Sequence, residues 1–159
     1  MMKRIRKAHV EDVETIYRLI KSASMSGAVL ARPVAELYET VRDFHVYQDE
    51  RAMVRGCCAL HVTWSDLAEL RSLVVDEAHR GQGVGTALVR ACIEEARRLR
   101  VRRVFALTSS VGFFTNLGFV VIDKHELPHK VWADCTRCVK FPDCDETPVL
   151  YHVGRDKQE

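Results

Sequence analysis

The chain has 159 residues, of which 47% are hydrophobic, and this is enough apolar material to fill the core of one domain. Its 24 lysines and arginines nearly balance 22 aspartates and glutamates, so charge predicts neither a nucleic-acid partner nor a membrane-surface partner. The start of the chain lacks the apolar segment of a signal peptide, and no run approaches the roughly 18 apolar residues of a membrane span. We therefore expect one domain over residues 1–159, a cytoplasmic location, and cysteines present as thiols.

Segments of helical and strand period alternate along the first half of the chain. Apolar residues at i, i+3, i+4 and i+7 predict a helix over residues 11–23, and a similar period after Pro33 predicts a second helix over residues 34–44. Residues 55–64 and 68–76 are predicted strands. The second strand is so apolar that we expect it at the centre of a sheet.

The second half continues the alternation. A long amphipathic helix is predicted over residues 84–99, a buried strand over 102–108, a short helix over 111–118 that ends at Gly118, and a strand over 119–123. The order predicts an α/β fold with a mixed sheet. From about residue 126 to 148 cysteines, prolines and aromatic residues replace this periodicity, so we expect a cysteine-rich elaboration of the domain there, followed by a strand-like segment.

Three glycines at alternate positions precede the long helix, in the stretch HRGQGVGTAL. A nucleotide P-loop requires Gly-Lys-Ser/Thr, but Gly85 is followed by Thr86 and Ala87. A dinucleotide-binding fold requires G-x-G-x-x-G and an acid at the end of the next strand, and this chain has neither. Two interpretations remain: an anion site made by backbone N–H groups at a helix N-terminus, or a glycine turn that only starts the helix.

The wider sequence favours the anion site. The stretch LRSLVVDEAHRGQGVGTALV resembles motif A of the GNAT N-acetyltransferases, and VFALTSSVGFFTNLGF resembles their motif B. The resemblance implies a mixed central sheet that is splayed at an acetyl-CoA site and flanked by helices. It also implies that acetyl-CoA is held by the following residues: Leu73, Val74, Val75, Arg80, Gly81, Gln82, Gly83, Val84, Gly85, Thr86 and Phe114.

Two further stretches, GAVLARPVAELYETVRDFHV and CCALHVTWSDLAELRSLVV, resemble the acetyltransferase domain of N-acetylglutamate synthases, especially the short bacterial forms. The resemblance implies transfer of acetyl from acetyl-CoA to L-glutamate, the entry reaction of arginine biosynthesis. The chain has no room for the kinase-like domain that carries arginine feedback in the long forms, so we do not expect that control here.

Amide formation from a thioester needs a neutral amine, and a base that removes a proton is therefore useful. The resemblance implies that Glu69 is this base; the alternative is a solvated glutamate beside Arg71. It also implies that Arg32 binds a carboxylate of glutamate; the alternative is a surface arginine. The substrate-binding residues that we expect are Arg32, Arg71, Ser72, Thr108 and Lys130. A backbone N–H of residues 71–73 is the natural donor to the oxyanion.

The chain departs from the family pattern at two places. Many members carry Phe-Tyr in motif B, where the tyrosine protonates the departing thiolate, but this chain has Phe113-Phe114, which leaves the general acid unassigned. Where the long synthases have Arg-x-Ser near the final strand, this chain has Asp145-Glu146-Thr147. Acetylation of another amine, on an amino acid or a protein terminus, therefore stays open, as does a non-catalytic acyl-CoA or metal sensor.

The cysteines raise two questions. Cys57, Cys58 and Cys92 lie in a predicted strand and on an apolar helix face, which favours core packing over an acetyl-cysteine intermediate. We call Cys135, Cys138 and Cys144 the tail cysteines; their spacing, C-x2-C-x5-C, is compatible with structural zinc, an iron–sulfur cluster or plain thiols. We expect small-molecule substrates, while the oligomeric state stays open, a homodimer included.

Overall fold

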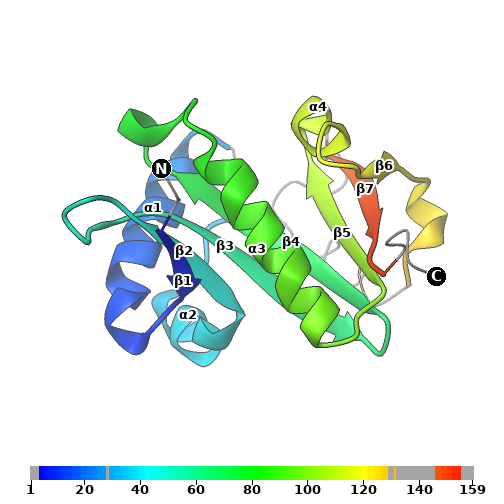
Figure 1. Cartoon of the computed structure of the whole chain (residues 1–159), viewed down its shortest axis with the longest axis horizontal. Coiled ribbons are helices and arrows are strands. Elements are labelled where there is room, and N and C mark those ends of the chain that lie inside the picture. Colours follow the sequence, from blue (N-terminus) through cyan, green and yellow to red (C-terminus); the bar gives the residue numbers. More distant parts are fainter. Residues whose placement is uncertain (1–3, 28, 129–130, 132–145, 155–159) are drawn as a thin grey trace.

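The computed structural model describes residues 4–27, 29–128, 131 and 146–154. Within these residues it contains one seven-stranded mixed sheet in the order β1-β2-β3-β4-β5-β7-β6 (Figure 1). The strands are β1 Arg4–Lys7, β2 Phe44–Gln48, β3 Val54–Trp64, β4 Leu67–Val75, β5 Arg103–Thr108, β6 Val120–Val121 and β7 Thr147–His152. The helices are α1 Val13–Met25, α2 Val34–Glu39, α3 Val84–Arg98 and α4 Val111–Thr115, with short 3-10 turns η1 Val10–Asp12, η2 Val41–Asp43, η3 Glu77–His79 and η4 Lys124–Glu126.

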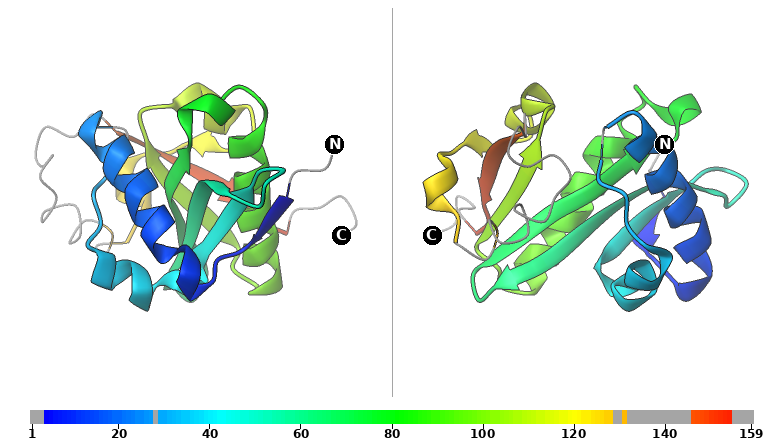
Figure 2. Two further views of the ribbon diagram at one scale, coloured as in Figure 1. Left: turned by 90° about the vertical axis from the view of Figure 1, so that its left-hand side faces the viewer. Right: turned by 180° about the vertical axis from the view of Figure 1, so that it is seen from behind.

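Helices cover both faces of the sheet. α1 and α2 lie on one face and α3 lies on the other (Figure 2). The predicted apolar stripe of α1 is buried beneath that helix, at Val13, Ile16 and Ile20. On the same side, Leu127 and Val131 from the start of the predicted elaboration pack on β5 and β7, where they form a third core cluster with Phe105. Leu127 and Val131 are therefore core residues.

Most predicted elements are confirmed, including the central position of the strand at residues 68–76, which is β4. The predicted helix over residues 34–44 is wrong in its second half, because α2 ends at Glu39 and Phe44 begins β2. Phe44 and Val46 are buried against α1 as strand residues, so core packing overrides the helical spacing. β1 and β2 are strands that were not predicted from the sequence, and the strand expected over residues 119–123 is shorter, Val120–Val121.

None of the helices in the described part of the chain has the length and apolar character that crossing a bilayer requires.

Candidate functional site

β4 and β5 run parallel but pair only near their start. The paired positions are Leu67 with Arg103, Ala68 with Val104 and Glu69 with Phe105. β4 continues to Val75, and the two strands diverge towards the end of the sheet where α3 begins and α4 lies (Figure 1). The splay of the central sheet that the resemblance implies is therefore present, beyond Glu69. An extended ligand placed there can hydrogen-bond to the backbone as an added strand does.

A β-bulge interrupts β4 at the start of this opening. Ser72 and Leu73 together stand opposite the single residue Cys58 of β3. Ser72 adopts a φ of +56°, which is uncommon for any residue other than glycine. The Cys57 thiol donates to the Ser72 carbonyl oxygen over 3.4 Å. This buried contact gives the Ser72 carbonyl a hydrogen bond at the point where the bulge disrupts the β3–β4 ladder.

The bulge changes which side chains face which helix. Because side chains alternate along a strand, an extra residue exchanges the two faces beyond it. Before the bulge, Leu70 packs in the core beneath α3, and Arg71 lies on the opposite face beside α2. After it, Val74 packs beneath α1, while Leu73 and Val75 pack on the α3 side. β4 therefore places the polar side chains of Glu69 and Arg71 on the face beside α2, and the apolar side chains of Leu73 and Val75 on the face beside α3.

The glycine stretch forms a loop that leads into α3. Gly81 and Gly83 have φ values of +74° and +80°, which side chains other than glycine rarely adopt. No heavy atom lies within 4 Å of a Cβ built at either position, so packing inside the protein does not require these glycines. The first N–H groups of α3 point out of the helix end, because intrahelical bonds start only with Ala87 N–H donating to the Gly83 carbonyl oxygen over 3.1 Å.

An open hollow of about 430 Å³ lies over this loop, and its walls come from η3, the glycines, α3 and α4. The lining residues are Val75, His79, Arg80, Gly81, Gly83, Val84, Gly85, Thr86 and Phe113. A positive arginine, a helix N-terminus and bare backbone make this hollow suited to a phosphate or diphosphate group.

Most residues predicted to hold acetyl-CoA lie at this hollow, but four do not line it. Gln82 is exposed and donates to the Ala78 carbonyl oxygen over 3.4 Å, and Leu73 packs on the α3-side core. Val74 is buried beneath α1, so only its backbone is near the opening. Phe114 is also buried, at 5% exposure, and its neighbour Phe113 lines the hollow instead. Phe113 therefore faces the hollow and Phe114 faces the core, because of the phase of α4; a contact of Phe114 with acetyl-CoA stays a prediction.

Charged side chains gather on the opposite face, beside α2. Arg71 Nη1 lies 3.6 Å from Glu69 Oε1, and Arg71 Nη2 lies 3.9 Å from Glu36 Oε1. Arg32 donates to the same Glu36 oxygen over 3.0 Å. The predicted residues Glu69, Arg71 and Arg32 are thus brought together, and Glu36 joins them.

Two features of this cluster favour an anionic ligand. Burial, followed by the positive charge of Arg32, lowers the pKa of Arg71 from its ordinary value, and an added negative charge would oppose this lowering by direct attraction. Arg32 Nε is buried and has no hydrogen-bond partner among the described residues. A carboxylate would supply the missing acceptor.

A histidine and an aspartate that were not predicted from the sequence lie beside this cluster. His61 Nδ1 lies 2.7 Å from Asp43 Oδ2, and His61 stands directly opposite Glu69 in the β3–β4 register. The strand pattern LHVTW contains the histidine but shows neither its cross-strand partner nor its contact with η2.

The remaining predicted residues differ in their surroundings. Ser72 is buried at the bulge, and Thr108 ends β5, where its hydroxyl accepts from the Ser110 N–H over 2.8 Å. Lys130 and the tail cysteines lie outside the described residues. Among the residues that the structure describes, no group of three or more His, Cys, Asp or Glu side chains is placed to hold a metal ion.

The three cysteines of the described residues are core residues. Cys57, Cys58 and Cys92 are each 0% exposed. Burial raises the pKa of Cys57 to about 12 and that of Cys58 well above its ordinary value. These surroundings support core packing of Cys57 and Cys58 over an acetyl-cysteine intermediate. Hydrogen bonds with Cys58 and His45 lower the pKa of Cys92, but its side chain is fully buried and closed to a substrate.

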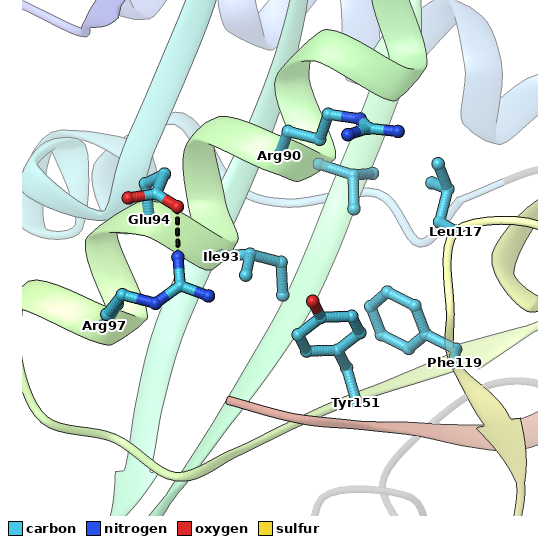
Figure 3. Close-up of a pocket in the computed structure, with 8 residues that line it drawn as sticks. Arg90, Ile93, Glu94, Arg97, Leu117, Phe119 and Tyr151 are labelled. Atoms are coloured by element: carbon cyan, nitrogen blue, oxygen red, sulfur yellow. Dashed lines mark hydrogen bonds and ion pairs between the residues drawn. The ribbon is translucent and has the colours of Figure 1, made fainter. Parts of the chain in front are cut away.

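A second hollow, of about 320 Å³, lies between the C-terminal half of α3 and β7 (Figure 3). Arg90 and Arg97 of α3 border it, Arg97 pairs with Glu94, and the Tyr151 hydroxyl is directed towards α3. None of the predicted site residues lines it, so it is separate from the opening between β4 and β5.

Comparisons with known proteins agree with this geometry. The chain is 39% identical over 146 residues to an uncharacterized N-acetyltransferase of Chlorobaculum tepidum, covering 92% of this chain and 94% of that protein. It is 37% identical over 135 residues to an amino-acid acetyltransferase of Mycobacterium tuberculosis, covering 84% of this chain and 77% of the relative.

Two solved structures are similar over nearly the whole chain. A Mycobacterium tuberculosis protein in complex with CoA and NLQ has a TM-score of 0.79 and 33% identity, covering 94% of this chain and 98% of that one. N-acetylglutamate synthase of Neisseria gonorrhoeae, complexed with coenzyme A and N-acetyl-glutamate, has a TM-score of 0.88 and 25% identity, covering 98% of this chain and 36% of that one. Residues 13–119, which run from α1 through the glycine loop to α4, match the Acetyltransferase (GNAT) family, and the chain belongs to that family.

Proposed function

We propose that the protein transfers the acetyl group of acetyl-CoA to the α-amino group of L-glutamate, giving N-acetyl-L-glutamate and CoA. The observation that carries this proposal is the convergence of Glu69 with Arg71 and Arg32 at the point where β4 and β5 part. The amino-acid acetyltransferase relative and the synthase neighbour with bound N-acetyl-glutamate support the same substrate class.

The donor would lie along the opening and the loop. The diphosphate of acetyl-CoA would accept hydrogen bonds from the N–H groups at the start of α3, with Arg80 beside it. The pantetheine arm would pair with the free edge of β4. A backbone N–H of residues 71–73, at the bulge, would then donate to the thioester oxygen as it gains negative charge.

The acceptor would approach from the face beside α2. Its ammonium group gives a proton to Glu69, whose side chain is 20% exposed, and the neutral amine attacks the thioester carbon. The tetrahedral intermediate carries one more proton on its nitrogen than the amide product, and water takes this proton as the carbon–sulfur bond breaks and CoA leaves as a thiolate. Phe113 and Phe114 have no proton to give, so water is our candidate donor to that thiolate.

The charges of the cluster bear on the choice of amino acid. A dicarboxylate that is buried without matching cations leaves uncompensated charge, so glutamate needs two basic partners. Arg32 and Arg71 are available, but both already contact Glu36. We therefore expect glutamate to be preferred over aspartate, with weak discrimination against neutral glutamine. A role in arginine biosynthesis follows only if glutamate is the better substrate.

The test is to incubate the protein with acetyl-CoA and each member of a panel of amino acids and amines, and to measure the rate at which the free thiol of CoA is released. Fastest release with glutamate supports the proposal. Faster acetylation of a lysine or peptide amine would keep the family chemistry and reject glutamate. Acetyl-CoA binding without release by any amine would favour the non-catalytic sensor.

A further inference from the structure

We infer that His61, oriented by Asp43, carries the substrate's proton from Glu69 to solvent during acetyl transfer. The inference rests on the proposed function in taking Glu69 as the first proton acceptor. It assigns a proton-relay role to a pair of side chains that the mechanism above does not use.

The geometry places His61 next to Glu69. The two residues are directly opposite each other in the antiparallel β3–β4 pair. Cβ atoms of such pairs lie about 4.5–5.5 Å apart, and both side chains project to the same face of the sheet. That face is the one beside α2, because Ala59, two residues before His61, packs in the core cluster beneath α1 and α2.

Exposure increases along the proposed path. The side chain of Arg71 is 15% exposed, that of Glu69 is 20% exposed, and that of His61 is 36% exposed. His61 is therefore the member of this group that meets solvent most freely. A proton delivered to it can leave without crossing the opening that the donor would occupy.

The contact with Asp43 fixes how the imidazole can act. Nδ1 lies 2.7 Å from the Asp43 carboxylate, so this nitrogen carries the hydrogen and donates it, which leaves the Nε2 lone pair as the acceptor. In the relay, an N–H bond of the substrate ammonium breaks and an O–H bond forms on Glu69. That O–H bond then breaks as Nε2–H forms, and water removes the proton from Nε2.

Other charges face the same group. Asp43 of η2, Glu69 of β4 and Glu36 of α2 favour the transient imidazolium, while Arg71 and Arg32 oppose it. The alternative role for the His61–Asp43 contact is purely structural: it would hold η2 against β3. The experiment must separate a relay from this structural role.

The kinetic test compares His61→Asn and Asp43→Asn with wild type, using the fastest amine of the panel. As a matched control we choose His125→Asn, because His125 is exposed in η4. We expect kcat to fall about tenfold to hundredfold in both site variants, with the acetyl-CoA KM unchanged and the deficit closing as pH rises and free amine becomes abundant. Added imidazole should restore turnover of His61→Ala. The kcat of the Glu69→Gln/His61→Asn double variant should be little lower than that of Glu69→Gln alone, because both residues act on the same proton.

A purely structural role gives a different pattern. Unchanged kcat and pH profile would overturn the inference, as would a loss that follows the fall in Tm and does not respond to imidazole. Should no amine be acetylated, the proposed function fails, and NMR decides the inference separately. The chemical shifts of the His61 ring should then change in Glu69→Gln and stay the same in His125→Asn. Unchanged shifts in Glu69→Gln would show that Glu69 and His61 are not coupled.

Discussion

The glycine loop gives the sharpest test of where the donor binds, through Gly83→Asp. Gly83 has a φ of +80° and open space around its missing Cβ, so the substitution meets backbone strain but no steric clash in the free protein. A left-handed conformation costs a residue with a side chain about 1–2 kcal/mol. For a domain of this size each kcal/mol lowers Tm by about 2–4 °C, and we expect a fall of about 2–8 °C in a protein that still folds.

The effect on acetyl-CoA affinity should be larger and separable from strain. If the loop holds a diphosphate, the new carboxylate faces about two negative charges, each costing about 1 kcal/mol at 4 Å in water. The total of about 2 kcal/mol corresponds to a roughly 30-fold rise in Kd, before any loss of backbone contact. Screening should reduce the rise at high salt.

Gly154 supplies the matched control, because it has a φ of +89° and open space but lies beyond β7. Calorimetric titration with acetyl-CoA should give an unchanged Kd for Gly154→Asp, with a similar fall in Tm. Equal affinities for the two variants would remove the loop from the donor site and leave it as a turn that starts α3.

Further predictions concern the acceptor site, the tail and the acid limit of stability. Glu69→Gln should lower turnover by about 10² to 10⁴, with a smaller loss at high pH; a loss below about tenfold at neutral pH would reject Glu69 as the base. Arg32→Ala should raise the glutamate KM more than the acetyl-CoA KM, and equal changes would contradict a substrate contact. If the tail cysteines hold metal, elemental analysis should find about one equivalent of zinc or iron, and changing all three to serine should lower Tm. Metal-free, fully active protein with three titratable tail thiols would exclude a metal site there. Arg6 lowers the pKa of Asp12, so their ion pair should stabilise the fold above the unfolded pKa of about 4 and lose this effect as pH falls through the lower folded value. The Tm of Asp12→Asn should therefore lie below wild type at pH 7 and approach it near pH 2; a constant difference would contradict the linkage.

The elements that the sequence predicted best are those whose apolar period is uninterrupted. α1 and α3 each bury one stripe, and their periodicity alone identifies them. The predicted helix over residues 34–44 failed because Phe44 continues the helical spacing by coincidence while it serves as a strand residue. β1, with the sequence RIRK, carries too little pattern to be seen without its partner β2.

The candidate site divides in the same way. The glycine loop is contiguous in the sequence, so its residues could be found from a motif. Glu36, Asp43 and His61 meet Arg71 and Glu69 only through strand register and the position of α2, neither of which a single sequence shows. The choice between Phe113 and Phe114 depends on the phase of a one-turn helix, which adjacent identical residues cannot indicate.

The bulge at Ser72 explains how one strand can serve both reactants. In an uninterrupted strand, Glu69, Arg71 and Leu73 would all project to the face beside α2, and the opening beside α3 would receive Ser72 and Val74 instead. The extra residue leaves Glu69 and Arg71 on the α2 face and turns Leu73 to the α3 face. The backbone between them crosses from the proposed acceptor side to the proposed donor side within two residues. Removal of the bulge by deleting Ser72 should therefore separate the proposed base, Glu69, from the proposed oxyanion donor, and we expect loss of turnover even in a variant that retains affinity for acetyl-CoA.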